Sequence, residues 1–405
     1  MSSSTVVVVG AGHCGLAMSR QLADRSIDHV VLERSDVASS WLHQRWDSLR
    51  LLTPNWMTRL PGFSYSGDEP DGYLAAREVA EVITAYASSF AAPVITGCTV
   101  TSVRPEGEGF AVTTDRGEWT ARAVVMAVGA TVGSTHPLAE GLPPGVVSVR
   151  ATDYRSPEQL PEGGVLVVGA AASGIQIAEE VHRSGRPVTL AVGEHVRMPR
   201  RYRGHDIFHW LDASGVLDER AEDMDDLVRA RNLPSMQLVG GDRTVDLNSL
   251  QESGVRLAGK LAGVRDVTLQ FSGSLRNVCA LADLKLGRLL GTIDEFAGGV
   301  GERGEPTAVP DAPLELDVRR EHLRSVVWAT GIKADFSCVA VPVLDARGRI
   351  KHEGGVTPWP GLYVLGLPVL RRRRSTFLDG ATDDSAAVAA ALAAHLARST
   401  ALAGS

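Results

Sequence analysis

The stretch VVVVGAGHCGLAMSRQLADRSIDHVVLE, residues 6–33, decides the fold of this 405-residue chain. The four valines that open it form an unbroken β-branched run, which is typical of a strand buried on both faces of a parallel sheet. Gly10, Gly12 and Gly15 follow at GxGxxG spacing, and the residues after Gly15 continue as a helix. In this motif the first glycine permits a tight turn, the second lets the backbone approach a pyrophosphate, and the third lets the helix pack on the strand. The stretch therefore predicts a dinucleotide site, with the phosphates at the helix N-terminus, where unpaired NH groups and the helix dipole favour anions.

An acid closes the second strand of this unit. Residues 29–32 form the strand, and Glu33 lies 18 residues beyond Gly15, where a carboxylate should accept the hydroxyls of an adenosine ribose. His13 and Cys14, inside the turn, are assigned to packing at the cofactor rather than to chemistry. The residues predicted to bind the first cofactor here are Gly10, Gly12, His13, Cys14, Gly15, Glu33 and Arg34.

The composition describes an ordinary globular protein of two or three domains. Hydrophobic residues make up 44% and charged residues 22%, and the net charge of −7 gives no reason to expect a nucleic-acid partner. Residues 1–5 lack a basic leader and no apolar run approaches a membrane span, so we expect a cytoplasmic protein without a membrane partner. A homodimer is left open.

The four cysteines are scattered without a CxxC pair, which argues against a disulfide scaffold, a zinc site and a dithiol relay. They are Cys14, Cys98, Cys279 and Cys338.

A second unit of the same kind begins at residue 165. A strand over 165–168 leads into GAAASG and then a helix over 175–183, with Ala171 in place of the middle glycine. The residues predicted to bind here are Gly169, Ala171, Ser173 and Gly174. No acid ends the next strand at Val192, although Glu194 is near, and Arg197, Arg200 and Arg201 follow. Loss of the acid beside a gain of arginines favours a 2′-phosphate, so NADPH is predicted over NADH; the alternative is that the arginines belong to a solvated loop.

Three further strands end in glycine. Residues 124–128 lead to Gly129, residues 326–328 lead through Ala329 to Gly331, and residues 362–365 lead to Gly366. The three glycines are predicted to face the first cofactor. The first domain is thus expected to be interrupted and to resume near residue 325. The predicted fold is α/β with two Rossmann-like dinucleotide-binding domains: residues 1–140 and 325–405 form the first, and residues 141–324, with a helical elaboration, form the second, inserted one.

Two other segments are candidates for the first site. Trp41 lies in a polar, irregular stretch, where it covers either a flavin ring or a domain interface, and we weigh these equally. Asp379 follows four arginines, 371–374, and precedes a helix that starts near Thr382. The N-terminus of that helix is expected to point back at the first cofactor, where its NH groups could stabilise negative charge.

Together, the two glycine motifs, the interrupted first domain and the strand ends at Gly129 and Gly331 resemble those of the two-dinucleotide-binding-domain flavoproteins. Within them the chain looks like the class B flavin monooxygenases, near the bacterial relatives of plant YUCCA-type enzymes. The resemblance implies FAD in the first domain and NADPH in the second. It also implies a monooxygenase that inserts one oxygen atom from O2 into a small organic substrate through a C4a-(hydro)peroxyflavin, with no metal. Asn55 matches the family's asparagine near the flavin edge and is the candidate catalytic residue.

One departure from the family keeps other activities open. The family fingerprint between the two nucleotide motifs contains a histidine, and residues 144–154 of this chain contain none. That histidine is linked in the family to moving between reduction and oxygenation. The alternatives are therefore an NADPH-dependent flavin reductase or oxidase that produces peroxide, and a flavin-binding regulator without turnover.

Overall fold

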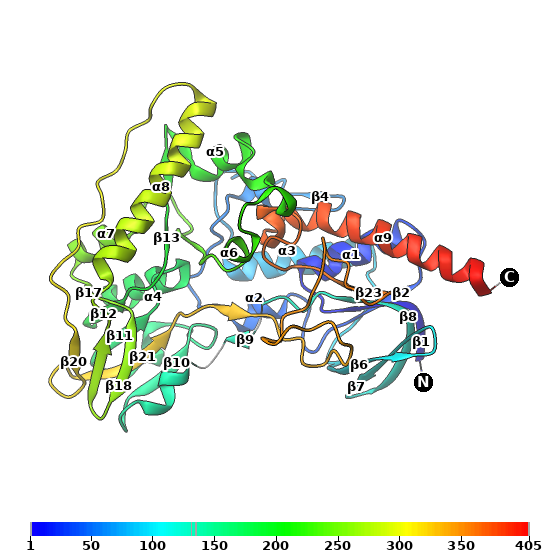
Figure 1. Cartoon of the computed structure of the whole chain (residues 1–405), viewed down its shortest axis with the longest axis horizontal. Coiled ribbons are helices and arrows are strands. Elements are labelled where there is room, and N and C mark those ends of the chain that lie inside the picture. The colour runs from blue at the N-terminus through cyan, green and yellow to red at the C-terminus, as the bar shows by residue number, and fades with distance from the viewer. Residues whose placement is uncertain (1, 131, 134–135, 404–405) are drawn as a thin grey trace.

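The computed structural model describes residues 2–130, 132–133 and 136–403. These residues form two units side by side, each built on its own sheet, of which one is mixed and the other parallel (Figure 1). The first unit contains both ends of the chain, and the second, drawn in green and yellow, is inserted between them. The predicted α/β fold with two dinucleotide-binding units is therefore confirmed.

The first unit is built on a seven-stranded sheet in the order β5-β2-β1-β8-β7-β6, with β23 also pairing β8. Its parallel strands are β1 (Ser2–Val9), β2 (His29–Leu32), β5 (Val94–Ile95), β8 (Gly117–Met126) and β23 (Leu362–Val364). Antiparallel β6 (Val100–Glu106) and β7 (Gly109–Thr114) extend it beyond β8. Its helices are α1 (His13–Ala23), α2 (Ser39–His43), α3 (Ala76–Ser89) and α9 (Gly380–Ala403), and a hairpin joins β3 (Arg59–Leu60) to β4 (Phe63–Ser64).

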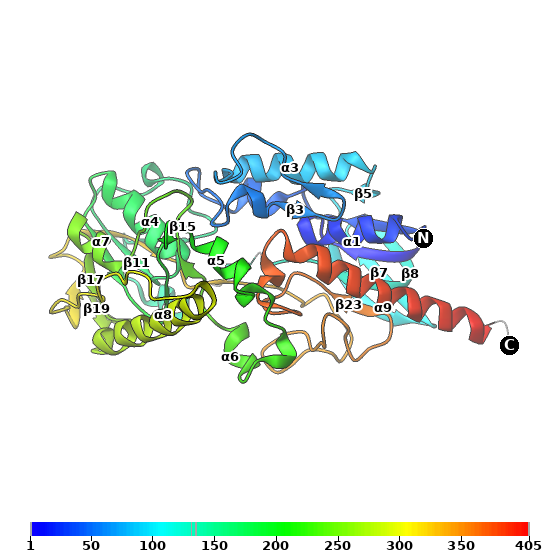
Figure 2. The ribbon, with the colours of Figure 1, turned by 90° about the horizontal axis from the view of Figure 1, so that it is seen from above.

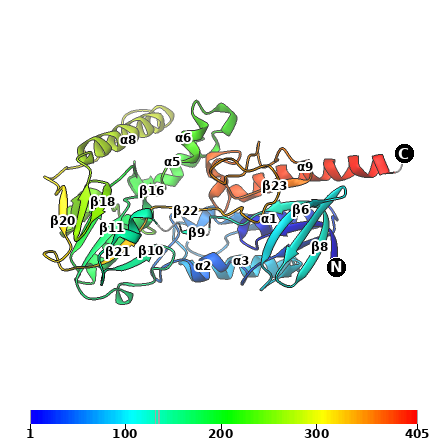
Figure 3. The same ribbon diagram turned by 60° about the horizontal axis from the view of Figure 1, so that its bottom comes forward.

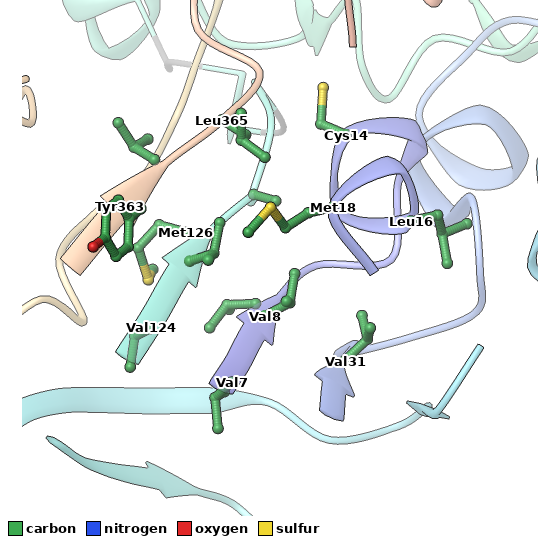
Figure 4. Packing of buried hydrophobic residues seen from close by; sticks show 14 of the residues in the cluster. Val7, Val8, Cys14, Leu16, Met18, Val31, Val124, Met126, Tyr363 and Leu365 are labelled. Atoms are coloured by element: carbon green, nitrogen blue, oxygen red, sulfur yellow. The ribbon is translucent and has the colours of Figure 1, made fainter. Parts of the chain in front are cut away.

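The valine run forms the centre of the first core, as its β-branched composition predicts. Val6, Val7 and Val8 are completely buried, because β1 lies between β2 and β8 and is covered on both faces. Figure 4 shows Met18 of α1 lying over Val8 and Met126 of the sheet. Burial of each such side chain contributes about 1.5–3 kcal/mol, so this packing fixes the position of the turn that follows β1.

The second unit is built on a five-stranded parallel sheet in the order β10-β21-β11-β12-β17. These strands are β10 (Val147–Arg150), β21 (Leu323–Trp328), β11 (Gly164–Val168), β12 (Val188–Ala191) and β17 (Arg256–Ala258). A second, antiparallel sheet contains β18 (Leu261–Arg265), β19 (Thr268–Phe271) and β20 (Glu315–Asp317). Its helices are α4 (Ala172–Arg183), α7 (Leu247–Ser253) and the long α8 (Leu275–Ala297).

A helical elaboration of the second unit reaches over to the first (Figure 2). Its elements are β13 (Val196–Arg197), β14 (Arg201–Tyr202), β15 (His205–Asp206), α5 (Ile207–Ala213), α6 (Leu227–Arg231) and β16 (Met236–Gln237). Phe208 and Leu211 of α5 share a hydrophobic cluster with Met57 and Phe377 of the first unit. Short 3-10 helices occupy Asn55–Met57, Pro137–Gly141, Pro157–Gln159, Val216–Asp218, Ala221–Asp223 and Arg373–Thr376. None of the helices, within the described residues, is long and apolar enough to cross a bilayer.

Strand pairing moves both predicted domain boundaries. The strand β21 pairs with β10 and β11, so residues 325–328 belong to the second sheet and the return to the first unit comes later than residue 325. Leu138 and Ala139 pack against the second unit's core, so the first segment ends before residue 140. Two short strands, β9 (Val132–Gly133) and β22 (Ile332–Lys333), pair where the chain crosses between units (Figure 3). An apolar strand followed by a small residue and a glycine occurs in both units. The sequence pattern therefore does not show to which sheet such a strand belongs, and only the strand pairing does.

Candidate functional site

The first glycine turn is closed by direct backbone contacts. Gly10 has a φ of +106°, and a β-carbon at this position would lie 2.6 Å from the carbonyl oxygen of Ala127. At Gly15 a β-carbon would lie 1.9 Å from the carbonyl oxygen of Gly10, so the helix could not approach the turn. At Gly12 a β-carbon would meet nothing within 4 Å. The turn therefore packs tightly on its inner side and is open at Gly12, where a phosphate must approach.

The second turn repeats this geometry. Gly169 also has a φ of +106°, and a β-carbon there would lie 2.4 Å from the carbonyl oxygen of Ala329. A β-carbon at Gly174 would lie 1.8 Å from the Gly169 carbonyl oxygen. Ala171 has φ −81° and ψ −173°, close to the φ −80° and ψ −179° of Gly12. Because any residue can adopt this extended conformation, alanine at the middle position keeps the shape of the turn.

This repeat corrects the prediction for the strand end that precedes Gly331. Ala329 and Thr330 abut the second turn, at Gly169, and the first turn instead contacts Ala127 and Val128. Each turn thus receives the end of a strand from its own sheet. A β-carbon on Gly331 would meet nothing within 4 Å, and the binding roles of Gly129 and Gly331 stay predictions.

Both turns present backbone donors at a helix start. Leu16 N donates to Gly12 O and Ile175 N donates to Ala171 O, which are the first hydrogen bonds of α1 and α4. Neither Gly12 nor Ala171 caps its helix through a side chain. The amide groups of each first turn, Ser173 among those of α4, therefore lie where an anion can accept from them.

Glu33 is buried against the first turn. One carboxylate oxygen accepts from the Ala11 amide at 2.7 Å and the other accepts from the Ser35 amide at 3.1 Å. Each carboxylate oxygen has a second lone pair, so a ribose hydroxyl can still be accepted at this position. Arg34 is exposed. Hydrogen bonds from Ser337, and to a smaller extent the charge of Arg34, lower the pKa of Asp335.

The start of α1 meets two segments from the C-terminal part of the chain. A β-carbon on Gly366 would lie 3.1 Å from the sulfur of Cys14, which places the end of β23 at the first turn. Burial, and second the charge of Asp384, raise the pKa of the Cys14 thiol to about 12. Burial lowers the pKa of His13 to about 4. Cys14 is therefore a protonated thiol and His13 a neutral imidazole near pH 7, so neither supplies a charge to the site.

Asp384 is a site residue that sequence reasoning missed. It is buried one residue after the first turn of α9, and one of its carboxylate oxygens has no hydrogen-bond partner among the described residues. Burial raises its pKa to about 6. A buried polar atom without a partner is costly to the fold, which fits a group that a bound cofactor completes. The signal in the sequence was an acid near the start of the helix that follows Gly366.

Asp379 lies just before α9 and is held by an arginine. Its carboxylate accepts from Nη1 of Arg374 at 2.7 Å, and burial, its largest influence, raises its pKa. The same guanidinium donates to Asp212 and Asp218 of the elaboration, and Arg373 pairs with Glu219. Through these ion pairs, Arg373 and Arg374 connect the elaboration to the start of α9.

A cavity of about 670 Å³ lies beside this ion-pair network. It is bounded by the β3–β4 hairpin and by the residues around the start of α9. Its lining includes Arg59, Phe63, Arg372, Arg374, Asp379 and Thr382. A small polar molecule can be accommodated there, next to the helix that begins beside the first turn.

Trp41 and Asn55 are engaged within the protein. Trp41 packs against the hydrophobic clusters of both units, which supports the domain-interface alternative. The buried side-chain amide of Asn55 donates to Glu69 O at 2.9 Å and accepts from Leu74 N at 2.8 Å. One N–H and one lone pair of this amide thus hold the 69–74 loop, and the catalytic role of Asn55 stays a prediction.

The predicted phosphate-binding arginines are also committed elsewhere. Arg197 bridges Asp246 and Asp283 at 2.9 and 2.7 Å. Arg200 is completely buried, donates to Asp206 and to the Leu52 carbonyl, and so joins the two units. Arg201 is exposed and lies 3.6 Å from Asp242. A phosphate would have to displace these carboxylates, of which Asp246 is buried, so this arrangement gives no support to Arg197 and Arg200 as phosphate ligands.

Comparison with known proteins now identifies the family. Residues 7–210, just over half of the chain, match the family model described as pyridine nucleotide-disulphide oxidoreductase. The chain belongs to this pyridine nucleotide-disulphide oxidoreductase family. Over 94% of its length it is 32% identical to an uncharacterized oxidoreductase, CzcO-like, of Geobacillus kaustophilus, covering 95% of that protein.

Further relatives and solved structures place the chain among flavin monooxygenase-like proteins, which confirms the predicted resemblance. Half of the chain is 31% identical to 51% of indole-3-pyruvate monooxygenase YUCCA1 of Oryza sativa. The fold matches the flavin-containing monooxygenase of Stenotrophomonas maltophilia with a TM-score of 0.70 and 19% identity, covering 98% of this chain and 100% of that one. The chain is thus an oxidoreductase, and the family and these neighbours support FAD and NADPH as its cofactors.

Proposed function

We propose that this chain is a monooxygenase that uses FAD at the first glycine turn and NADPH at the second to insert one oxygen atom from O2 into a small organic substrate. The observation that carries the proposal is the pair of equivalent turns, at Gly10 and Gly169, each closed by a strand end of its own sheet. The balanced reaction consumes NADPH, a proton, O2 and the substrate, and yields NADP⁺, water and the oxygenated substrate.

The residues at the first turn fit FAD. The open face at Gly12 and the amides that begin α1 suit a pyrophosphate, and the Glu33 carboxylate suits a ribose. The buried, unpartnered oxygen of Asp384 suits a hydroxyl or NH group of the same cofactor. When bound, the flavin accepts a hydride from NADPH and reacts with O2, and the protein's part is to hold it and to exclude water.

The cysteines argue against the disulphide chemistry in the family's name. All four are free thiols, and they do not form a CxxC motif. Burial raises the pKa of Cys14 to about 12 and that of Cys279 to about 11, so neither is a thiolate near pH 7. Electrons accepted at the first turn are therefore expected to pass to O2 and substrate rather than to a dithiol.

One observation favours a second candidate, an NADPH oxidase that releases hydrogen peroxide. Residues 144–154 lack the histidine that the family fingerprint carries. In this case NADPH, a proton and O2 would yield NADP⁺ and hydrogen peroxide. Both candidates use the same two turns, so they differ only in the fate of oxygen.

The test starts from the purified protein. Denaturation should release FAD, and anaerobic NADPH should bleach the bound flavin. Rapid mixing of the reduced protein with oxygenated buffer then separates the candidates: a transient near-ultraviolet band before reoxidation supports the monooxygenase, and immediate reoxidation with stoichiometric peroxide supports the oxidase. Failure to bind FAD would refute the proposal, and a bound flavin that NADPH does not reduce would leave the flavin-binding regulator.

A further inference from the structure

A carboxylate at the end of β12 is paired with a lysine from outside the dinucleotide unit. Glu194 follows β12 and lies 20 residues beyond Gly174, in the region where Glu33 stands relative to Gly15. Its carboxylate accepts from Nζ of Lys285 on α8 at 2.8 Å. The residues that follow the second strand of such a unit face the adenosine ribose, and Glu194 comes two residues after Val192, which is equivalent to Glu33. This ion pair therefore lies close to where NADH and NADPH differ.

Two more cations lie near the end of β12. Lys260 follows β17, the neighbour of β12 in the sheet, and its Cγ lies 4.0 Å from where a β-carbon on Gly193 would be. Lys285 foremost, and also Arg229, lower the pKa of Glu194. Within the described residues neither Lys260 nor Arg229 forms an ion pair of its own. The end of β12 therefore carries one acid among three cations.

This excess of positive charge replaces the arginines that the sequence suggested. Arg197 and Arg200 are bound to carboxylates inside the protein. Lys285 pairs only with Glu194, whose side chain is 54% exposed, and Lys285 itself is 22% exposed. An incoming phosphate can therefore take the place of the Glu194 carboxylate on Lys285 without breaking a buried ion pair.

We propose that Lys285, with Lys260 and Arg229 beside it, binds the adenosine 2′-phosphate, and that Glu194 is the internal counter-ion which this phosphate displaces. The proposal rests on the assignment of the second turn to NADPH. Glu194 has a second effect, because its carboxylate can accept the free 2′-hydroxyl of NADH. The two residues therefore set the preference between NADPH and NADH. Lys285 favours NADPH, and Glu194 reduces that preference.

The binding of nucleotide fragments tests the proposed role of Lys285 and Glu194 without any flavin chemistry. Binding of 2′,5′-adenosine bisphosphate and of 5′-AMP to the full-length protein would be measured by calorimetry. Lys285→Met should weaken the bisphosphate about tenfold and leave 5′-AMP nearly unchanged, because one charge-assisted contact is lost. Glu194→Gln should strengthen the bisphosphate several-fold. The opposite signs exclude general damage to the fold as the cause.

Two controls sharpen the result. Lys351→Met removes one positive charge from the first unit and should change neither affinity. Arg201→Met tests the arginine that is still exposed, and should also have little effect. Unchanged bisphosphate binding in Lys285→Met and Glu194→Gln, a bisphosphate bound no tighter than 5′-AMP by the unaltered protein, or a large loss in Arg201→Met would each overturn the proposal. Flavin reduction by NADPH tests the proposed function separately, because fragment binding needs no turnover.

Discussion

Gly12→Ala is expected to leave the fold intact and to weaken FAD binding. A β-carbon at Gly12 would meet nothing within 4 Å, and Ala171 already adopts the same backbone conformation at the second turn. Alanine at a compatible glycine position stabilises a protein by about 0.4–1 kcal/mol, because the unfolded chain loses freedom. The free energy of unfolding of the FAD-free protein should therefore stay equal or rise slightly.

The added methyl group would occupy the face that the phosphates approach. Loss of one charge-assisted hydrogen bond costs about 1.5–3 kcal/mol, which corresponds to FAD binding weaker by roughly 10- to 150-fold. Fluorescence titration with FAD and urea unfolding of the FAD-free protein give the two quantities separately.

Gly15→Ala is the matched control. Its β-carbon would lie 1.9 Å from the Gly10 carbonyl oxygen, so the turn itself must move and the free energy of unfolding should fall by about 1–3 kcal/mol or more. A Gly12→Ala variant that is destabilised as much as Gly15→Ala, or one that binds FAD as tightly as the unaltered protein, would refute the assignment of the open face.

Three other substitutions have definite expected outcomes. Glu33→Ala should lower FAD affinity by about 1–3 kcal/mol, measured by titration, because the Ala11 amide and the ribose lose an acceptor. Asp384→Asn should change how stability depends on pH. In the unaltered protein the pKa of Asp384 is about 6 when folded and 3.8 when unfolded, so the protonated acid favours folding. This contribution to the free energy of unfolding is complete below pH 3.8 and is lost as pH rises through 6. The FAD-free Asn variant should therefore be less sensitive to pH across this window and more stable at pH 7 by about 1–3 kcal/mol, and an unchanged urea profile at pH 4 and pH 7 would contradict this. Arg200→Met should destabilise the protein by about 3–5 kcal/mol in urea, because Asp206 loses its buried partner, yet leave the preference between nucleotides unaltered; a changed preference would restore the phosphate role.

The sequence alone determined the two dinucleotide units, because their geometry is local. Gly10 and Gly15 contact each other within a single turn, and the four valines before them are buried as their β-branched composition predicts. The same reasoning holds for Gly169 and Gly174. A strand, a glycine turn and a helix that follow one another directly can be recognised from spacing, since each contact joins residues close together in the chain.

Tertiary structure decided the features that join distant residues. The strand before Ala329 resembles the one before Ala127, and only its pairing with β11 shows that its end abuts the second turn. Asp384 meets Cys14 through the packing of the two ends of the chain.

The charged residues near the second turn show most directly what spacing in the sequence does not predict. Arg197 finds its carboxylate partner Asp283 86 residues away, and Glu194 finds Lys285 91 residues away, so spacing within the motif could not separate a structural cation from one available to a ligand. A charged side chain acts through whatever partner the fold places beside it, and that partner is set by the packing of α8 and the elaboration on the second sheet.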